Sequence, residues 1–580
     1  MLCRSAIRLR SRVCVLPTSI VNSYFSPRTT ATDSFLIAPF RRFSDQSTIT
    51  SPTNPFKVAI VGSGPSGFYT AKYLLKEVAS TADNPLQCSI DILEKLPTPY
   101  GLVRSGVAPD HPDVKNVENE FAAILDSPPT SPNNNNSSPN PIQFYGNVNV
   151  GSTSSITLPE LLELYDAVVL TYGCDSDRSL GIPGEELEGV HSAREFVSWY
   201  NGHPDYVHFT EVFGRYLKNA TAKKQTRVVI VGQGNVALDC ARILTKSVQD
   251  GKDSLFHTDI TQHSLSVLGN NDDDDDDDNN TSGGGGVAVS IVGRRGHVQG
   301  SFTIKELREL TKMEKNHDCT FVVRDDELEL GGSTPSSQVE VTDSRAKKRI
   351  DKLLRSVSTP TGAIDETESA TKNSIHIRYL WNPISFNAPT DNNDNSQSQQ
   401  SVKSVTFERT RLTGEPHAQT AVGTGEYTTL PADLVLKSIG YKGRPLPGLD
   451  ELGVDSGDVS VFDERRGVIR NINGRVGVER LYVAGWIKRG PSGIIGTNIT
   501  DARDTVASML EDLPLLTSTN SNKLGRDGLL ALLTERNVKV VDWNSWREIN
   551  RVETDPGRRR SDSQPREKLV SVDGMLDILN

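Results

Sequence analysis

Two regions of the chain alternate short apolar runs with helical stretches. In the first region, the apolar run Lys57–Val61 ends in glycines, and a helical stretch separates it from a second apolar run, Cys88–Leu93. The second region repeats this order with Arg227–Val231, a helical stretch and, after a long gap, Val287–Val292. Short apolar runs that alternate with helices are typical of parallel βαβ units. The sequence therefore predicts an α/β protein with two units of related design.

Four polar stretches interrupt this pattern. They are rich in Ser, Pro, Asn, Asp or charged residues, and the second contains the run Asp272–Asp278 followed by four glycines within 283–286. Such stretches cannot bury enough apolar surface to offset the entropy lost on ordering, so each is predicted to be a mobile surface insert. The four predicted inserts are residues 127–140, 269–286, 389–403 and 553–566.

The first 43 residues differ in composition from the rest of the chain. They contain seven arginines and one acidic residue, Asp33, together with many serines and threonines. This composition is typical of an organellar transit peptide, so residues 1–43 are left out of the expected fold. A mitochondrial address is favoured, while a chloroplast address and a disordered basic tail stay open as alternatives.

The overall composition excludes several classes of protein. The chain has 580 residues and a formal net charge of −11, and no nucleic-acid partner is expected. No apolar run reaches the roughly 18 residues that a membrane span requires, although peripheral membrane association stays open. The six cysteines do not occur in CxxC or CxxxxC spacing, so no metal site, redox dithiol or internal iron–sulfur cluster is predicted.

A glycine-rich turn follows the first apolar run. Gly62, Gly64 and Gly67 form a GxGxxG pattern between a predicted strand and a predicted helix. The first glycine of this pattern permits a tight turn, the second lets the backbone approach a pyrophosphate, and the third lets the helix pack closely on the strand. Glu94 ends the next predicted strand, where a carboxylate can accept a hydrogen bond from a ribose. The pattern therefore predicts a dinucleotide site.

A second turn, beginning at Gly232 and Gly234, has the variant pattern GxGxxA. No acidic residue ends the next predicted strand, and Arg294 and Arg295 occur there instead. Paired guanidinium groups suit a 2′-phosphate, so NADP(H) is preferred over NAD(H), with a solvated basic turn as the alternative. Two dinucleotide sites in one chain indicate electron transfer between a nicotinamide and a flavin.

Longer strings of the sequence go beyond these two fingerprints. They are Tyr100–Arg104 with Val107–Pro112, Tyr165–Leu170 with Ile182–Glu185, Gly232–Asp239, Phe302–Leu307, Ser438–Lys442, Gly485–Gly493 and Leu532–Arg536. Together they resemble the adrenodoxin reductase family, the mitochondrial NADPH–ferredoxin reductases. The strings occur in the family's order, and the resemblance covers most of residues 56–580 apart from the polar inserts.

The resemblance implies two Rossmann-like domains, with an FAD domain split in sequence by an inserted NADPH domain. It places the FAD domain at residues 44–174 and 443–580 and the NADPH domain at residues 175–442. Beside Gly62, Gly64 and Gly67, the implied FAD contacts are Ser66, Glu94, Leu102, Val150, Trp486, Gly493, Ile494 and Ile495. The implied NADPH contacts are Gly232, Gln233, Gly234, Asn235, Val236, Arg294, Arg295, Glu306 and Gly493. Ser66 and His297 depart from the family, which commonly has alanine and proline at these positions.

The resemblance also implies electron transfer from NADPH through FAD to an acidic [2Fe-2S] ferredoxin of the adrenodoxin type. Mitochondrial pathways such as iron–sulfur cluster, steroid or cofactor biosynthesis would receive these electrons. Positioned cofactors carry out such a reaction, so no dedicated catalytic residue is expected. The basic cluster Arg345, Lys347, Lys348 and Arg349 is predicted to meet the partner, with a solvated helix face as the alternative. A flavin monooxygenase and a non-catalytic nucleotide-binding scaffold remain as rival interpretations.

Overall fold

A computed structural model describes nine stretches of the chain. They are residues 55–80, 87–126, 141–217, 225–269, 286–360, 372–389, 401–452, 460–518 and 523–580. These stretches lie within one compact unit, Ile49–Asn580, and the predicted transit peptide lies outside the described residues. Among the helices that the structure describes, none is both long enough and apolar enough to cross a membrane.

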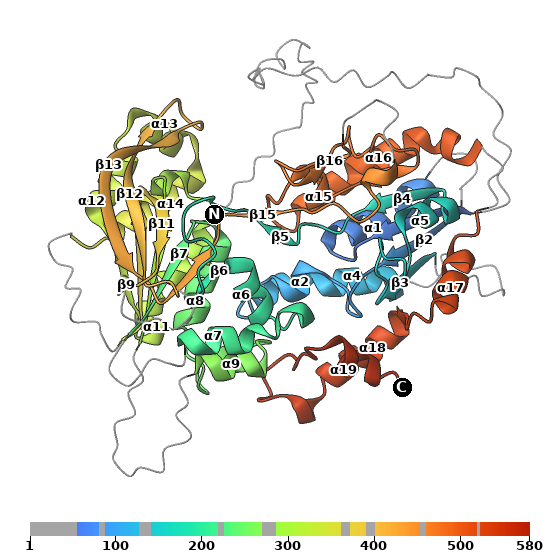
Figure 1. Ribbon diagram of the computed structural model, residues 1–580, viewed down its shortest axis with the longest axis horizontal. Helices are drawn as coiled ribbons and strands as arrows, with labels where there is room; N and C mark the ends of the chain where they lie inside the picture. Colours follow the sequence, from blue (N-terminus) through green and yellow to red (C-terminus); the bar gives the residue numbers. More distant parts are fainter. Residues whose placement is uncertain are drawn as a thin grey trace, which may run out of the picture. The chain divides into compact units, whose positions relative to one another are not determined.

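The first apolar run forms the centre of a six-stranded sheet (Figure 1). The strand order is β18-β4-β1-β2-β3-β19, and all neighbours pair in parallel except β19, which is an antiparallel edge strand. Val58 and Ile60 of β1 enter one core cluster, and Ala59 and Val61 enter another. Because β1 is buried on both faces, its sequence is an unbroken apolar run. The strands are β1 (Phe56–Val61), β2 (Cys88–Leu93), β3 (Ile142–Gly146), β4 (Ala167–Leu170), β18 (Leu481–Val483) and β19 (Val541–Asp542).

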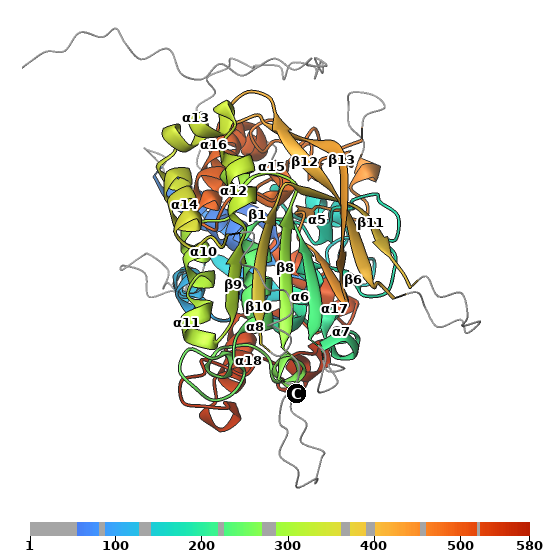
Figure 2. The ribbon, with the colours of Figure 1, turned by 90° about the vertical axis from the view of Figure 1, so that its left-hand side faces the viewer.

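The second apolar run lies in a second six-stranded sheet, which is entirely parallel. Its order is β6-β14-β7-β8-β10-β9, and Figure 2 shows β9, β10 and β8 as neighbouring arrows. Here too, alternate residues of the central strand β7 enter two different core clusters. The strands are β6 (Val190–Ser192), β7 (Thr226–Val231), β8 (Val287–Gly293), β9 (Thr320–Val323), β10 (Ser374–Tyr379) and β14 (Leu434–Lys437).

A three-stranded antiparallel sheet follows directly on β10. Its strands are β11 (Trp381–Asn387), β12 (Ser404–Thr413) and β13 (Thr420–Pro431), with β12 in the centre. Val405 and Phe407 of β12 are fully buried in the same core cluster as Val229 and Val231 of β7. This antiparallel sheet therefore packs on one face of the second parallel sheet. The larger core cluster, which contains Val228 and Ile230 of β7, lies on the other face.

Helices fill the connections between the strands. α1 (Pro65–Ala79) joins β1 to β2, α16 (Thr497–Ser518) packs against α1, and α8 (Asn235–Thr245) follows β7. The other helices are α2 (Leu102–Ser105), α3 (Pro112–Lys115), α4 (Val117–Asp126), α5 (Leu158–Leu164), α6 (Ala193–Tyr200), α7 (Phe209–Leu217), α9 (Gln262–Leu268), α10 (Ile304–Leu310), α11 (Met313–His317), α12 (Asp325–Gly332), α13 (Pro335–Asp343), α14 (Arg345–Ser356), α15 (Trp486–Arg489), α17 (Arg526–Glu535), α18 (Trp543–Glu553) and α19 (Val572–Asp577).

The structure confirms an α/β fold with two parallel sheets, and each predicted strand of the two βαβ units agrees with the structure within one residue at either end. The chain leaves the first sheet after β4 and returns to it at β18. The short strands β5 (Ser176–Asp177) and β15 (Tyr441–Lys442) pair antiparallel between these two points. They lie beside the expected domain boundaries, whose exact positions remain a prediction.

The prediction of a mobile surface insert at residues 553–566 is wrong. Glu553 is fully buried and accepts two hydrogen bonds from the Arg104 guanidinium, at 2.9 and 2.6 Å. Arg560 donates to the backbone carbonyls of Phe256, Thr258 and Ile260. The polar composition misled the prediction because the charged side chains of this segment pair with buried partners far away in the sequence.

The other three predicted inserts fall mainly outside the described residues. The third is shorter than predicted, because Val402 is fully buried against the core of the second parallel sheet. The two ends of the aspartate-containing insert, Gly269 and Gly286, are described and flank α9 and β8.

Candidate functional site

The first glycine turn is a tight connection between β1 and α1. Gly62 has φ +110°, and a Cβ on this residue would lie 2.7 Å from the Cα of Tyr172. Only glycine therefore fits there. In contrast, a Cβ on Gly64 would meet nothing within 4 Å. The turn thus leaves open space beside the N-terminus of α1, where backbone N–H groups and the helix dipole favour a phosphate.

Glu94 lies directly beside this turn, at the end of β2. One carboxylate oxygen accepts hydrogen bonds from the Ser63 N–H at 3.1 Å and the Ser63 hydroxyl at 2.7 Å, and the other accepts from the Leu96 N–H at 3.2 Å. The carboxylate is thereby fixed in orientation by the chain itself. Each carboxylate oxygen can accept more than one hydrogen bond, so this orientation is compatible with a ribose hydroxyl as a further donor.

Three further segments of the expected FAD site have residues close to the same turn or to Glu94. A Cβ on Gly485, which precedes Trp486, would lie 2.5 Å from the Ser66 hydroxyl oxygen, and a Cβ on Gly101, which precedes Leu102, would lie 3.2 Å from the Cα of Gly64. The N–H of Val148, two residues before Val150, donates to the carbonyl of Glu94 at 2.9 Å. The structure therefore brings these three segments close to the first turn, and their contact with FAD stays a prediction.

One observation fits a bound ligand at this turn. The Ser66 hydroxyl is buried and has no hydrogen-bond partner among the described residues. The Ile494 side chain, between Gly493 and the start of α16, is 67% exposed. A buried hydroxyl without a partner costs free energy, and a ligand that forms a hydrogen bond with it would remove that cost. The residues thus suit a polar ligand such as a dinucleotide.

The second glycine turn repeats the geometry of the first. Gly232 has φ +121°, and a Cβ there would lie 2.1 Å from the carbonyl oxygen of Ser438. A Cβ on Gly234, however, would meet nothing within 4 Å, so open space again lies at a helix N-terminus, here that of α8. Asn235 accepts a hydrogen bond from the Thr303 N–H at 2.8 Å, and Val236 packs against the core cluster of this unit.

The two predicted arginines follow β8, the strand next to the second turn. Arg294 and Arg295 both have exposed side chains, and among the described residues neither guanidinium forms an ion pair. Gln233 of the glycine turn reaches across Gly293, which directly precedes Arg294, to donate to the Arg378 carbonyl at 2.9 Å. Two guanidinium groups that extend into solvent beside an open glycine turn are available for an anionic ligand.

A buried charge cluster joins the two βαβ units, and its central residue, Arg242, was not among the residues singled out from the sequence. Arg242 of α8 is 2% exposed and bonds to Asp110 at 2.6 and 3.1 Å, to Asp239 at 2.7 Å and to Glu306 at 3.4 Å. His111 pairs with Glu306 at 3.5 Å and with Glu309. An arginine among apolar positions of a helix was the available signal, because such a residue needs buried carboxylates as partners.

This cluster shifts the pKa values of its members. Burial alone would raise the pKa of Asp110, but Arg242 and Lys246 hold that pKa well below its usual range. Burial alone would lower the pKa of His111, but the hydrogen bond to Glu309 raises it. Burial and the nearby Asp239 carboxylate raise the pKa of Glu306. The cluster thus favours a protonated imidazole close to a carboxyl group that holds a proton more readily than usual.

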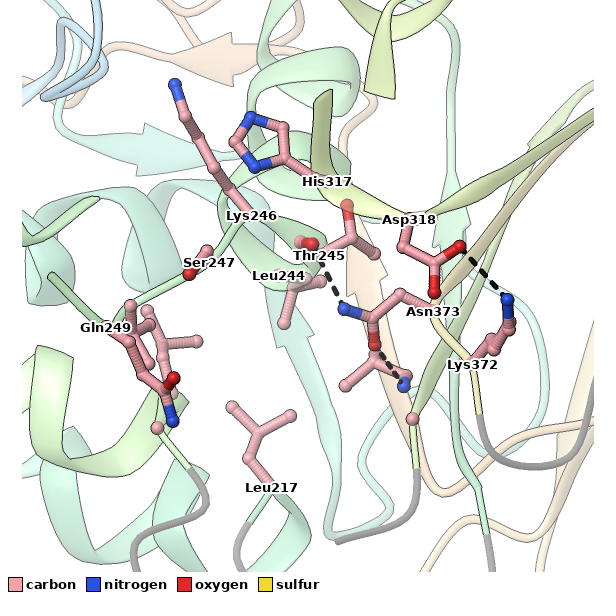
Figure 3. Close-up of a pocket in the computed structure, with 15 residues that line it drawn as sticks. Leu217, Leu244, Thr245, Lys246, Ser247, Gln249, His317, Asp318, Lys372 and Asn373 are labelled. Atoms are coloured by element: carbon pink, nitrogen blue, oxygen red, sulfur yellow. Dashed lines mark hydrogen bonds and ion pairs between the residues drawn. The ribbon is translucent and has the colours of Figure 1, made fainter. Parts of the chain in front are cut away.

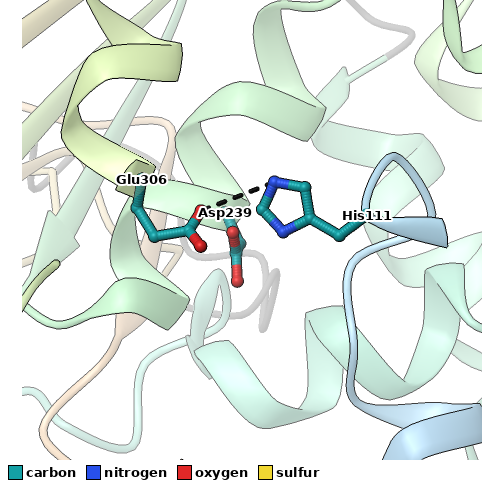
Figure 4. Close-up of side chains that lie close together, drawn as sticks. All are labelled: His111, Asp239 and Glu306. Carbon is teal, nitrogen blue, oxygen red and sulfur yellow. Dashed lines mark ion pairs between the residues drawn. The ribbon is translucent and has the colours of Figure 1, made fainter. Parts of the chain in front are cut away.

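His111, Asp239 and Glu306 bring potential metal-ligating atoms within 4.8 Å of one another, and Figure 4 shows the three side chains converging. The guanidinium of Arg242 already donates to both carboxylates. It therefore supplies the positive charge that these carboxylates need. We assign the cluster to a charge network between the two units. Asp110, His111 and Asp239 each form hydrogen bonds within this network.

A cavity of about 360 Å³ lies at the opposite end of α8 from the glycine turn (Figure 3). Lys246, His317 and Asp318 line it, and so do Gly269 and Gly286, the ends of the aspartate-containing insert. It lies at the start of β8, whereas Arg294 follows the end of that strand. This cavity is therefore separate from the dinucleotide turns, and the aspartate insert begins and ends at the far side of the unit from the arginines.

The predicted basic cluster lies on α14. Arg345, Lys348 and Arg349 are exposed, whereas Lys347 forms an ion pair with Glu340, which is 1% exposed. Burial would raise the pKa of Glu340, but hydrogen bonds from Lys347, Gln419 and the backbone N–H of His417 lower it to about 2. Lys347 therefore anchors the helix, and the other three residues of the cluster are exposed.

Comparison with known proteins agrees with this geometry. The family described as "Pyridine nucleotide-disulphide oxidoreductase" matches residues 56–318. The chain is 38% identical to "NADPH:adrenodoxin oxidoreductase, mitochondrial" of Arabidopsis thaliana, over 90% of this chain and 95% of that protein. The human protein of the same name is also 38% identical, over 90% of this chain and 92% of that protein. The structure of Mycobacterium tuberculosis FprA in complex with NADPH matches with a TM-score of 0.72 at 35% identity, over 90% of this chain and 99% of that one.

The two parallel sheets, each with its own glycine turn, define an oxidoreductase that uses FAD and NADP(H). Within that class, the chain belongs to the family of the NADPH:adrenodoxin oxidoreductases. This confirms the resemblance inferred from the sequence strings.

Proposed function

We propose that this protein transfers electrons from NADPH through FAD to a ferredoxin. The observation that carries the proposal is the presence in one compact unit of two open dinucleotide turns, of which only the second is followed by exposed arginines. FAD supplies the chemistry when bound, since a flavin accepts a hydride from a nicotinamide and releases single electrons. The residues of the chain bind and orient the two cofactors, and none is assigned as a nucleophile.

The first turn is assigned to FAD. Gly62, Gly64 and Gly67 give the pyrophosphate access to the helix N-terminus, and the fixed carboxylate of Glu94 meets the ribose. Ser66 lies in this turn, and Leu102, Val150 and Trp486 are assigned as FAD contacts because their neighbours Gly101, Val148 and Gly485 approach the turn or Glu94. Gly493, Ile494 and Ile495, which precede α16, complete the assigned FAD contacts. Residues 44–174 and 443–580 are accordingly proposed as the two parts of the FAD domain.

The second turn is assigned to NADPH within a proposed domain of residues 175–442. Gly232, Gly234 and Val236 form the open turn, and Gln233 and Asn235 fix it by their hydrogen bonds. Arg294 and Arg295 meet the 2′-phosphate. Glu306 and Gly493 are assigned as further NADPH contacts, although Glu306 also belongs to the buried charge network.

The ferredoxin is proposed to be acidic, to hold a [2Fe-2S] cluster and to dock on α14. The chain has a formal net charge of −11, so an acidic partner needs a local basic surface. Arg345, Lys348 and Arg349 supply such a surface, while Lys347 holds the helix in place through Glu340.

Residues 1–43 are proposed to direct the protein to mitochondria, as their arginine-rich and acid-poor composition indicates. A fluorescent fusion of the full chain is expected to enter mitochondria. The same fusion without residues 1–43 is expected to stay outside, and the truncated protein is expected to keep its activity in vitro. Mitochondrial import of the truncated fusion, or chloroplast import of the full one, would contradict this assignment.

A stopped-flow experiment tests the reaction. The purified protein is expected to carry about one FAD per chain and to lose its flavin absorbance on mixing with NADPH. Added oxidised ferredoxin is then expected to be reduced. FAD binding without reduction by NADPH would favour the nucleotide-binding scaffold, and oxygen consumption coupled to an oxygenated product would favour the monooxygenase.

A further inference from the structure

The loop that carries Arg294 and Arg295 is held in place by hydrogen bonds to its backbone carbonyls. Their side chains are exposed, so the position of each guanidinium depends on where the loop places its Cα. The Thr410 hydroxyl donates to the carbonyl of Arg294 at 2.7 Å, and the Leu380 N–H donates to the carbonyl of Arg295 at 3.3 Å. Both donors come from segments more than 80 residues further along the chain.

Thr410 and Leu380 are themselves joined. The N–H of Thr410 donates to the carbonyl of Leu380 at 2.8 Å, and Thr410 is only 5% exposed. Thr410 lies on β12 where its pairing with β13 shifts register, between Glu408 and Thr410. Such irregularities re-aim side chains, and here the hydroxyl of Thr410 meets the arginine loop.

A buried glutamate fixes the β10–β11 junction to which Leu380 belongs. Glu327 is 1% exposed and accepts hydrogen bonds from the N–H of Tyr379 at 2.6 Å and from the indole of Trp381 at 2.9 Å. It also pairs with Arg378 at 2.9 Å, and the carbonyl of Arg378 accepts the hydrogen bond from Gln233. The junction therefore connects the arginine loop to the second glycine turn.

We propose that Thr410 is a positioning residue for recognition of the 2′-phosphate of NADPH. The proposal deepens the assignment of the second turn to NADPH and rests on it. Thr410 does not contact the nucleotide; it holds the backbone from which Arg294 reaches the phosphate. A long side chain binds an anion well only when its backbone is held in a fixed position. Loss of the Thr410 hydroxyl is therefore expected to weaken 2′-phosphate binding without changing the glycine turn.

Equilibrium binding to the FAD-loaded protein tests this role. Adenosine 2′,5′-bisphosphate probes the 2′-phosphate site, and NAD⁺, which lacks that phosphate, is the comparison ligand. Thr410→Val is expected to raise the dissociation constant of the bisphosphate about three- to tenfold, the loss that one hydrogen bond predicts, and to leave that of NAD⁺ unchanged. Thr410→Ser keeps the hydroxyl and is expected to bind both ligands as the wild type does.

Thr406→Val is the matched control. Thr406 lies on the same strand, and its hydroxyl accepts a hydrogen bond from Asn387 at 2.8 Å and lies 3.3 Å from that of Thr429, away from the arginine loop. This variant is expected to bind the bisphosphate normally. Thermal unfolding of every variant checks the fold, and Thr410→Ala replaces Thr410→Val if the latter does not fold.

The inference is overturned if the variant without the hydroxyl binds the bisphosphate as tightly as the wild type. Equal losses for both ligands, or an equal loss in Thr410→Ser, also overturn it. If the wild type itself does not prefer the bisphosphate over NAD⁺, the proposed use of NADPH fails instead. The two failures are therefore distinguishable.

Discussion

The two glycine turns of this protein have the same backbone geometry but are completed by opposite charges. In both turns, a glycine with φ above +100° packs against a neighbouring strand end, and the next glycine faces open space. At the first turn, the residue that ends the next strand is Glu94, and the chain's own donors hold its carboxylate. At the second turn, Arg294 and Arg295 occupy the corresponding place and extend into solvent. Under the proposed assignment, each turn binds a dinucleotide, and the residue after the next strand distinguishes the two nucleotides.

The surroundings of the two turns also differ. Ser63, a residue of the first turn itself, orients Glu94, so this carboxylate is held by a residue that is close in the sequence. The arginine loop of the second site is oriented by Thr410 and Leu380, which come from distant strands. Five predictions follow in order of decreasing expected effect, and those on Gly232, on Arg294 and Arg295, and on Ser66 test this difference.

Gly232→Ala is expected to abolish reduction of the flavin by NADPH, with a loss of more than about 100-fold. A Cβ there would lie 2.1 Å from the Ser438 carbonyl oxygen, and φ is +121°, so the turn must move away from the pyrophosphate. The flavin absorbance should remain, because the first turn is untouched. Gly234→Ala is the control for folding: its Cβ meets open space, so the apoprotein should unfold as the wild type does. Loss of FAD from Gly232→Ala would contradict the expectation that the two turns bind their cofactors independently.

Arg294→Ala and Arg295→Ala are expected to raise the Michaelis constant for NADPH by roughly one to two decades each. Loss of one charge-assisted hydrogen bond costs about 1.5–3 kcal/mol. The Michaelis constant for NADH should hardly change, because NADH has no 2′-phosphate. Steady-state reduction of ferricyanide with each nucleotide measures both constants. Equal losses with NADPH and NADH would show that the arginines do not distinguish the two nucleotides.

These two sites also show how far the sequence could predict the structure. The strands, both glycine turns and the paired arginines were predictable because each depends on residues that are close together in the sequence. Arg242 and Thr410 could not be assigned, since their roles depend on partners such as Asp110 and Arg294 that only the fold brings near. The prediction of a mobile insert at residues 553–566 was wrong for the same reason, because composition does not reveal that Arg104 lies opposite Glu553.

Glu340→Gln is expected to lower the free energy of unfolding by about 1–3 kcal/mol at pH 7, because Lys347 would lose its negatively charged partner and the new amide NH2 would face hydrogen-bond donors. The pKa of Glu340 is about 2 in the folded protein and 4.5 ordinarily. Its ionised form therefore stabilises the fold above about pH 5, and this contribution disappears as the pH falls towards 2. Urea unfolding at several pH values should show the difference between variant and wild type shrinking over that range. A difference that is independent of pH would contradict this ionisation.

Replacing Arg345, Lys348 and Arg349 together by alanine is expected to slow ferredoxin reduction about tenfold at low salt and to flatten its salt dependence. Exposed charges act mainly on the association rate, and salt screens them over about 10 Å at 0.1 M. Reduction of ferricyanide by NADPH should be unchanged, because this small acceptor needs no docking surface. Unlike Lys347, these three residues can be replaced without disturbing Glu340. A wild-type ferredoxin rate and salt dependence would make α14 a solvated helix face only.

Ser66→Ala is expected to have the smallest effect, and its sign depends on the cofactor. The Ser66 hydroxyl is buried, and no described residue bonds to it, so the apoprotein should become slightly more stable, by up to about 1 kcal/mol, when the hydroxyl is removed. If the hydroxyl bonds to FAD, as the assignment of the first turn favours, the variant should also release FAD about two- to tenfold more readily. Thermal unfolding of the apoprotein and fluorescence titration with FAD measure the two effects separately. A variant that destabilises the apoprotein would mean that this hydroxyl has a partner within the chain, and the assignment of the hydroxyl to FAD would then fail.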